Sequence, residues 1–444
     1  MSQKYKIGIL NNWAYKKTKL YSPWIYELNA EVYPYKDYHI NWLPTENLDL
    51  LITHLHYQEP EASIVINAVA KDIPTLILSD GILEYRNTWD KPISPSKDGT
   101  IQYQGIEYPP LPPASVFQPV LGHKIAALGR SPTRLIESWG NIGKCEIVGL
   151  PRLDEYLTRS PRHRQVNEPF RILIMTARTP GFNQQQMKAV QESLQDLKSW
   201  LFANPKIDGL KIQPLWRLTQ NLDEVIGVDS SIADDLTGAE LASVLENVDA
   251  MITTPSTAML EGMLQGIPVA LLDYNNCPHF VPAAWRIAAP QHIEQVIPEL
   301  INPPAPKMLY QDTILHDALE CQTPAKNRMV QLVQSMIEIG RSCKENNQTL
   351  EFPMQILPDP QSGHHLPEKR FDLQQLYPDH PVFGNMDRTC LQVENGHLKL
   401  EVARLKQRLA TTQAKRKEKS FYGKFRGKLS KLKHRLLSNF QKTE

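Results

Sequence analysis

The sequence contains few cysteines, and their spacing favours neither a disulfide framework nor a zinc site. Their number is odd and none belongs to a Cys-x-x-Cys pair: Cys145, Cys277, Cys321, Cys343 and Cys390. Isolated cysteines of this kind are typical of a protein in a reducing compartment. We therefore expect a cytoplasmic protein without structural disulfides.

The chain also lacks long hydrophobic runs. No stretch approaches the roughly 20 apolar residues that a membrane-spanning helix needs. The amino-terminal MSQKYKIGILNNW has only a few apolar residues in a row before Asn11, which predicts a first strand and not a signal peptide. An excess of one charge is absent as well, because 49 Lys and Arg face 48 Asp and Glu. No whole-chain field therefore favours a polyanion, and we expect no nucleic acid partner.

Three motifs of nucleotide-dependent enzymes are missing: Gly-x-Gly-x-x-Gly, Gly-x-x-x-x-Gly-Lys-Ser/Thr and Asp-x-Asp. Their absence argues against a dinucleotide redox enzyme, a P-loop nucleotidase and a metal-dependent glycosyltransferase. His54 and His56 share one face of a predicted strand, but no third ligand lies nearby in the sequence. Core or cleft-lining histidines are therefore favoured over a metal site, and we expect neither a metal ion nor a cofactor.

Short apolar runs do alternate with longer amphipathic stretches, first in KIGIL, DLLITHL, IPTLILS and KCEIVGL, and again from RILIMTA onward. This alternation predicts parallel strands joined by helices, and 444 residues are too many for one core. The polar TRSPRHRQVNEP separates the two series. We predict an α/β fold with two Rossmann-like lobes, residues 1–160 and 161–341, that face a cleft with ligands at the carboxyl ends of the strands.

Beyond residue 341 the sequence predicts a Pro-rich linker, residues 342–386, and a helical basic tail, residues 387–444. An apolar stripe with spacings of seven, four, three and four predicts a short coiled coil or packing stripe over 391–409, which permits a homo-oligomer: Leu391, Leu398, Val402, Leu405 and Leu409. Residues 411–444 carry eleven Lys or Arg against two Glu, and bulky apolar residues line one helical face. This pattern favours peripheral contact with the anionic inner face of the plasma membrane, with an interaction helix or a nucleic-acid tail as alternatives.

The stretch TTPSTAMLEGMLQGIPVALLDY contains the strongest candidate for a ligand site. Ser256 and Thr257 stand where a helix begins, and Gly266 stands where it ends. Free backbone amides at the start of a helix favour the binding of a phosphate. Glu261 follows Thr257 by one turn on the same helical face, where its carboxylate can accept hydrogen bonds from two ribose hydroxyls. Alternatively, Ser256 only caps the helix and Glu261 pairs with a basic neighbour.

Two motifs, which follow each other along the chain in the right order, resemble those of the GT-B glycosyltransferases and their relatives. These relatives are the nonhydrolysing nucleotide-sugar 2-epimerases and the teichoic-acid polymer transferases. VDAMITTPSTAMLEGMLQGIPVALLDY is similar to the donor motif, in which a Ser/Thr pair and a following Glu hold the nucleotide. KCEIVGLPRLDEYL is similar to the interlobe passage Val-Gly-x-Pro-Arg-x-Asp of surface-polymer transferases. The resemblance covers about residues 6–342 and implies an acceptor-side lobe over 1–160 and a nucleotide-sugar lobe over 161–341.

Further positions extend this resemblance. LKIQPLWR stands where the polymer transferases carry Lys-x-His-Pro, so that Lys211 matches and Gln213 replaces the His. The resemblance implies that Lys211, Arg217 and Arg178 lie near the donor phosphates, where a cation can neutralise the departing diphosphate. A solvated loop residue is the alternative for Arg178.

ILSDGILEYRNTW stands where these families place a His-Gly pair at the tip of a strand of the first lobe, and Asp80 replaces the His. Asp80 can act as general base toward an acceptor hydroxyl if burial or a neighbouring carboxylate, such as Glu84, raises its pKa. A plain turn at Asp80, with Arg86 paired to Glu84, is an equal alternative.

We therefore expect a metal-independent glycosyltransferase of cell-envelope biosynthesis. It would move a sugar from a nucleotide-diphosphate sugar to a surface or capsular polysaccharide or to a lipid-linked acceptor. A nucleotide-sugar 2-epimerase is one alternative. The other is a non-catalytic nucleotide-sugar-binding scaffold with a membrane-associating tail, which the replacements at Asp80 and Gln213 favour.

Overall fold

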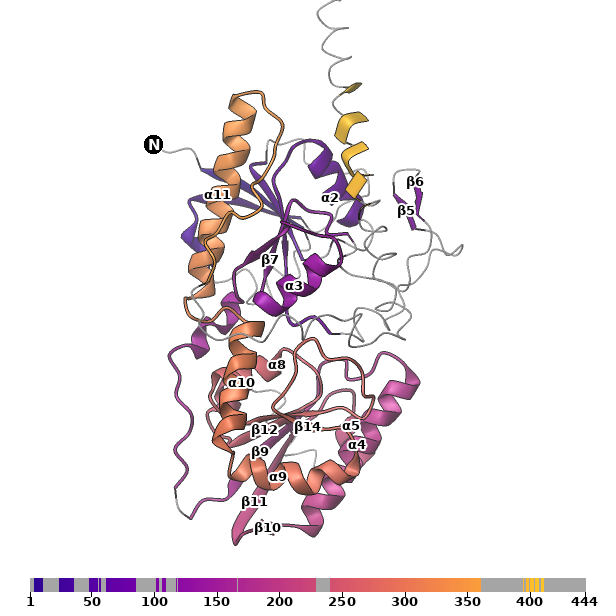
Figure 1. Ribbon diagram of the computed structural model, residues 1–444, viewed down its shortest axis with the longest axis vertical. Helices are drawn as coiled ribbons and strands as arrows, with labels where there is room; N and C mark the ends of the chain where they lie inside the picture. Colours follow the sequence, from indigo (N-terminus) through magenta and orange to yellow (C-terminus); the bar gives the residue numbers. More distant parts are fainter. Residues whose placement is uncertain are drawn as a thin grey trace, which may run out of the picture.

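The structure is a computed structural model, shown in Figure 1. It describes residues 4–10, 24–35, 48–54, 56, 61–84, 101–103, 106–108, 117, 119–165, 167–228 and 240–360, together with parts of 394–410. The chain forms two α/β lobes, drawn one above the other, and each lobe contains a six-stranded sheet.

The first lobe, at the top of Figure 1, has an entirely parallel sheet. Its strands in spatial order are β2 (Ala30–Tyr35), β1 (Tyr5–Leu10), β3 (Leu50–Thr53), β4 (Thr75–Leu78), β7 (Lys124–Ala127) and β8 (Cys145–Ile147). Every residue of β3 and β4 is buried, as expected for central strands that are covered on both faces. The remaining elements are the short helix η1 (Trp24–Glu27), the helices α2 (Glu61–Ala70) and α3 (Arg130–Ser138), and a hairpin of β5 (Ile101–Tyr103) and β6 (Ile106–Tyr108).

The second lobe repeats this plan. Its strands in spatial order are β10 (Lys206–Ile207), β11 (Leu210–Arg217), β9 (Phe170–Met175), β12 (Ala250–Thr253), β13 (Val269–Leu272) and β14 (Trp285–Ile287). All neighbours are parallel except the hairpin of β10 and β11. The helices are α4 (Gln184–Ala203), α5 (Leu222–Ile226), α7 (Leu241–Leu245), α8 (Ala258–Leu264), η4 (Pro290–His292), α9 (Ile293–Ile301) and α10 (Ala305–Ala318).

Both sheets share one strand order. Without β10, the second strand lies beside the first, and the third lies on the first strand's other side. This is the doubly wound order in which ligands bind at the carboxyl edge where the strand order reverses. The reversal falls between β1 and β3 in the first lobe and between β9 and β12 in the second. The predicted fold of two Rossmann-like lobes is confirmed.

The chain crosses between the lobes twice. The short helix η3 (Pro151–Tyr156) leads out of the first lobe, and α11 (Ala325–Glu345) returns to pack against η1 and β3. Arg341 of α11 pairs with Asp49 of the first lobe at 2.7 Å. The prediction that residues 161–341 form one lobe therefore needs correction, because an amphipathic helix pattern does not say which lobe the helix covers.

Residues 350–360 also pack on the first lobe, although we predicted a linker over 342–386. Lys124 and Glu146 form an ion pair at 2.8 Å, and each side chain is only 1% exposed. Lys124 donates to the carbonyl of Pro353 at 2.7 Å, and Glu146 accepts the amide of Leu357 at 3.0 Å. A buried ion pair thus holds this segment in place through backbone groups. Residues 361–393 lie outside the described part of the chain.

The described residues between 394 and 410 are helical and also contact the first lobe. Leu400 is 8% exposed and belongs to the core of that lobe. Arg404 pairs with Asp72 at 3.0 Å. The predicted basic helix over 411–444 lies outside the described residues. Within the described part, no helix is both long and apolar enough to cross a membrane.

Candidate functional site at the junction of the lobes

The start of α8 is one of the points where the second lobe touches the first. Thr257 immediately precedes α8, and its Oγ1 accepts the amide of Ile82, from the loop after β4, at 3.1 Å. A Cβ on Gly81 would lie 2.2 Å from the same Oγ1, so this contact requires glycine at position 81. Ser256 Oγ accepts the amide of Ala258 at 3.2 Å, which is the local capping that we had considered as an alternative.

Glu261 is held by two side chains of η3. Its Oε1 accepts from Arg152 Nη1 at 2.8 Å, and its Oε2 accepts from the hydroxyl of Tyr156 at 2.8 Å. Burial, followed by the charge of Glu261 and the hydrogen bond to it, raises the pKa of Tyr156, which therefore stays a donor. The two motifs that carry the family resemblance thus contact each other across 109 residues of sequence, between Arg152 and Glu261.

This pairing answers one of the open alternatives, since Glu261 does have a basic neighbour. The residue is only 7% exposed. Each carboxylate oxygen offers two lone-pair sites, so each keeps one site beyond these two bonds. The predicted contact of Glu261 with ribose hydroxyls stays a prediction.

Arg217 adds a second cation to this cluster. It ends β11, opposite Met175 of β9, and is half-buried. Burial lowers the pKa of Arg217, while the charges of Glu261 and Tyr156 act to raise it. Two guanidinium groups therefore lie around one carboxylate, and the excess positive charge favours an anionic ligand.

Arg178 lies at the switch point of the second sheet. It follows β9 by three residues, and it is exposed. The neighbouring amide of Ala177 donates to Thr254 Oγ1, just beyond β12, at 2.8 Å. This bond ties together the two loops that flank the switch point, and so it brings Arg178 to the same edge of the sheet as Ser256 and Thr257.

Lys211 does not lie at this edge, contrary to our prediction. It is the second residue of β11 and pairs in register with Lys206 of the hairpin, at the amino end of the sheet. Six residues of extended strand separate it from Arg217, or about 20 Å. A match to a sequence motif does not show which end of the strand each cation occupies.

In the first lobe, the carboxyl ends of β3 and β4 carry the candidate acid–base groups. Asp80 lies two residues beyond β4 and is exposed, so burial, one of the two conditions for its predicted role, is absent. Glu84 is half-buried in the same loop. Its effect on Asp80 stays a prediction, and Arg86 lies outside the described residues.

His54, which we considered from the sequence only as a core or cleft-lining histidine, is a further candidate for this site. It directly follows β3, at the switch point of the first sheet, and its Nδ1 is buried without a hydrogen-bond partner in the described structure. Burial lowers the pKa of His54, while the charges of Asp80 and Glu61 act to raise it. A neutral imidazole therefore lies in the field of two carboxylates. The run DLLITHL places His54 near the end of a strand, but only the strand order shows that this end lies at the switch point.

His56, by contrast, is a core residue, as we favoured. It is fully buried, its ring lies 5.4 Å from that of Phe117, and burial lowers its pKa to about 3. Among the described residues, no group of three or more His, Cys, Asp or Glu is placed to hold a metal ion.

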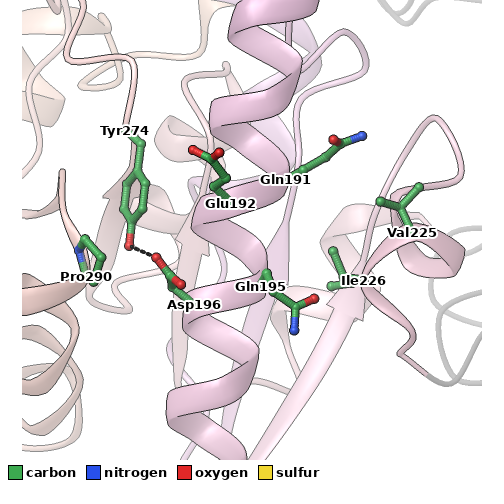
Figure 2. A pocket seen from close by; sticks show the side chains of 8 residues that line it. All are labelled: Gln191, Glu192, Gln195, Asp196, Val225, Ile226, Tyr274 and Pro290. Atoms are coloured by element: carbon green, nitrogen blue, oxygen red, sulfur yellow. Dashed lines mark hydrogen bonds between the residues drawn. The ribbon is translucent and has the colours of Figure 1, made fainter.

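A separate cavity of about 590 Å³ lies on the second lobe (Figure 2). Side chains of α4 and α5 line it together with Tyr274, which follows β13, and Pro290. The hydroxyl of Tyr274 donates to Asp196 at 3.2 Å across this cavity. Its lining includes none of the eight predicted site residues, so it is distinct from the junction of the lobes.

Comparisons with known proteins find similarity in solved structures alone. No family model matches the chain. No curated protein matches it either. Among solved structures, a protein of Listeria monocytogenes assigned as a UDP-N-acetylglucosamine 2-epimerase has a TM-score of 0.47 at 10% identity, covering 76% of this chain and 97% of that chain.

The UDP-GlcNAc 2-epimerase of Methanocaldococcus jannaschii, in complex with UDP-GlcNAc and UDP, has a TM-score of 0.46 at 10% identity, covering 75% of this chain and 99% of that one. A variant of the wall teichoic acid polymerase TagF has a TM-score of 0.44 at 11% identity, covering 76% and 89%. These are the kinds of protein that the sequence motifs resemble. Likenesses this distant carry no argument about substrate, and the fold assignment rests on the strand order.

Proposed function

We propose that the chain is a GT-B-like glycosyltransferase. It moves a sugar from a nucleotide-diphosphate sugar to a surface polysaccharide or a lipid-linked acceptor without a metal ion. One observation carries this proposal: polar and charged side chains occupy the switch points of both parallel sheets, and the two edges meet at the contact of Gly81 with Thr257. Ligands of doubly wound folds bind at such edges.

The second lobe supplies the donor side of this proposal. The donor diphosphate lies near Arg178 and the hydroxyls of Ser256 and Thr257. The net positive charge of Arg152, Arg217 and Glu261 adds to the electrostatic attraction for the diphosphate. Fixed cations stabilise the charge that develops on a departing diphosphate. Glu261 reaches the ribose through its remaining lone pairs, in an orientation that Arg152 and Tyr156 fix.

The first lobe supplies the base. The bond between the sugar and the diphosphate breaks, a bond between the sugar and the acceptor oxygen forms, and the acceptor proton passes to the imidazole of His54. Because its pKa is lowered by burial, His54 is neutral and able to accept a proton at pH 7. Asp80 and Glu61 then stabilise the imidazolium. This role extends the base prediction from Asp80 to its neighbour.

Calorimetric titration of the full chain with UDP, GDP, CDP and CMP tests the donor site. We expect one nucleoside diphosphate to bind, and Arg178→Ala to weaken that binding at least tenfold. Lys211→Ala is the matched control, because it removes another exposed cation of the same lobe at the opposite end of the sheet. Binding of none of the nucleotides to a cooperatively folded chain, or equal losses in both variants, would contradict the proposal.

Product analysis then separates the proposed activity from its alternatives. A transferase releases free nucleoside diphosphate only when an acceptor is present. An epimerase interconverts two nucleotide sugars without an acceptor, and a scaffold binds a nucleotide sugar without turning it over.

Peripheral membrane attachment through residues 411–444 is part of the same proposal, since a lipid-linked acceptor stays in the bilayer. Co-sedimentation with anionic vesicles tests that attachment.

A further inference from the structure

The helix within residues 394–410 has two different faces. One face packs on the first lobe through side chains three, four and seven residues apart: His397, Leu400 and Arg404. Leu400 is 8% exposed in the core, and Arg404 holds both Asp72 and the carbonyl of Leu350, the latter at 2.6 Å. These contacts fix the orientation of the helix on the lobe.

The other face is an apolar stripe that points away from the lobe. Four large side chains on it are about half exposed: Leu398 at 59%, Val402 at 46%, Leu405 at 54% and Leu409 at 59%. Their spacings of four, three and four are those of the a and d positions of a heptad repeat. In that register the lobe contacts His397 and Arg404 fall on c and Leu400 falls on f, the positions that face away from a coiled-coil seam.

We propose that this stripe pairs with the same stripe of a second copy of the chain, in a parallel two-stranded coiled coil. The residue types at the seam favour two strands, since leucine occupies d at 398 and 405 and β-branched Val402 occupies a.

The charges beside the seam favour a parallel arrangement of two identical helices. Glu401 falls on g, and Lys406 falls on the e position that a parallel, in-register partner brings opposite it. An antiparallel pair centred on the seam would instead bring Glu401 beside its own copy and Lys406 beside its own copy. The second copy therefore matches the stripe in shape and charge.

A parallel dimer has a consequence for membrane contact. Two parallel helices end on the same side, so both copies of the basic segment 411–444 would start from one point. Two linked membrane contacts bind more tightly than either alone, because the second becomes intramolecular. The proposed dimer is independent of the proposed catalytic activity.

Sedimentation equilibrium of the full chain over a wide concentration range tests the dimer. We expect a monomer–dimer equilibrium whose dissociation constant rises at least tenfold in Leu398→Glu/Leu405→Glu. Ala410→Glu is the control for an added negative charge, because it places one glutamate on an exposed position beside Leu409 but outside the seam. The substituted leucines are exposed, so the melting temperature of the lobes stays unchanged and a folding defect is distinguishable.

A charge exchange tests the parallel register. Glu401→Lys and Lys406→Glu should each weaken self-association, whereas a mixture of the two variants should form heterodimers, and the double variant should recover the wild-type dimer. A monomer at every concentration would overturn the proposal, and would mean that another segment of the chain or another protein covers the stripe. A dimer that is insensitive to both the leucine and the charge substitutions would overturn it as well.

Discussion

The carboxyl edges of the two sheets share one strand order but differ in how their polar groups are satisfied. At the edge of the second lobe, Glu261 accepts two bonds from η3, and Arg217 lies in the same cluster. At the edge of the first lobe, His54 keeps a buried nitrogen without a hydrogen bond in the described structure. A paired cluster holds a fixed shape, whereas an imidazole with an open nitrogen can gain and lose a proton.

This difference arises from the chain path. The short helix η3 leaves the first lobe and lies against α8, so it brings Arg152 and Tyr156 to the second lobe's edge. In return, the first lobe's edge receives Thr257, which binds the backbone of Ile82. In the proposed function, the second edge binds the donor and the first edge accepts the proton.

The largest predicted effect is a loss of catalytic rate, without a loss of stability, when His54 at the first lobe's edge is substituted. His54→Gln should lower kcat/KM by about 10²–10⁴-fold, or about 3–5 kcal/mol, because a general base is lost while a polar group of similar size remains. Its free energy of unfolding, measured in urea, should stay close to that of the wild type. A stability loss that accounts for the whole loss of rate would assign His54 a structural role.

The opposite pattern is expected at the second edge. Glu261→Ala leaves the guanidinium of Arg152 and the hydroxyl of Tyr156 without their acceptor, so it should lower the free energy of unfolding by about 3 kcal/mol. Glu246→Ala is the matched control, because Glu246 also pairs with an arginine, Arg159, but is 51% exposed. We expect less than about 1 kcal/mol there. Equal losses in the two variants would mean that the pairing of Glu261 stabilises the fold no more than an exposed ion pair does.

The sequence predicted the two sheets because their strands are short, apolar and regularly interrupted. It predicted Ser256 and Thr257 at one edge because they follow a strand end, and the family resemblance added Arg178. It did not predict that Arg152 holds Glu261, since no local pattern records a contact across 109 residues. It misplaced Lys211 because a motif match carries no strand polarity.

The sequence also gave no sign that α11 returns to the first lobe. The helix has an apolar face that either lobe could bury, and its location depends on pairs such as Arg341 with Asp49, which are 292 residues apart. Asp154 of the interlobe motif also contributes, because its carboxylate accepts the amide of Ala325, the first residue of α11, at 2.7 Å. Such contacts between residues far apart in the sequence cannot be predicted from local sequence patterns.

The contact between the two edges can be strained directly. Gly81→Ala places a Cβ 2.2 Å from Thr257 Oγ1, so the loop after β4 and the start of α8 must move apart. We expect the free energy of unfolding to fall by about 1–3 kcal/mol. Thr257→Ala in the same chain removes the clashing oxygen, and a double-mutant cycle should recover most of the loss. Simple additivity of the two substitutions would mean that the edges do not meet at these residues.

The smallest effect separates two histidines of one chain segment, His54 and His56. Burial lowers the pKa of His56 to about 3, below the ordinary value of 6.5 that applies in the unfolded chain. As pH falls below 6.5, the unfolded state binds a proton that the folded state does not, so the free energy of unfolding should fall by up to about 1.4 kcal/mol per pH unit. His56→Leu should flatten the stability profile by this slope between pH 6 and about 4, as measured by urea unfolding at each pH, and should leave the pH dependence of kcat/KM unchanged. His54→Gln should remove the acid limb of the rate profile, because the imidazole accepts the proton of the acceptor. It should also flatten the stability profile, because burial lowers the pKa of His54 as well. If His56→Leu instead altered the rate profile, the division between a core histidine and an edge histidine would be wrong.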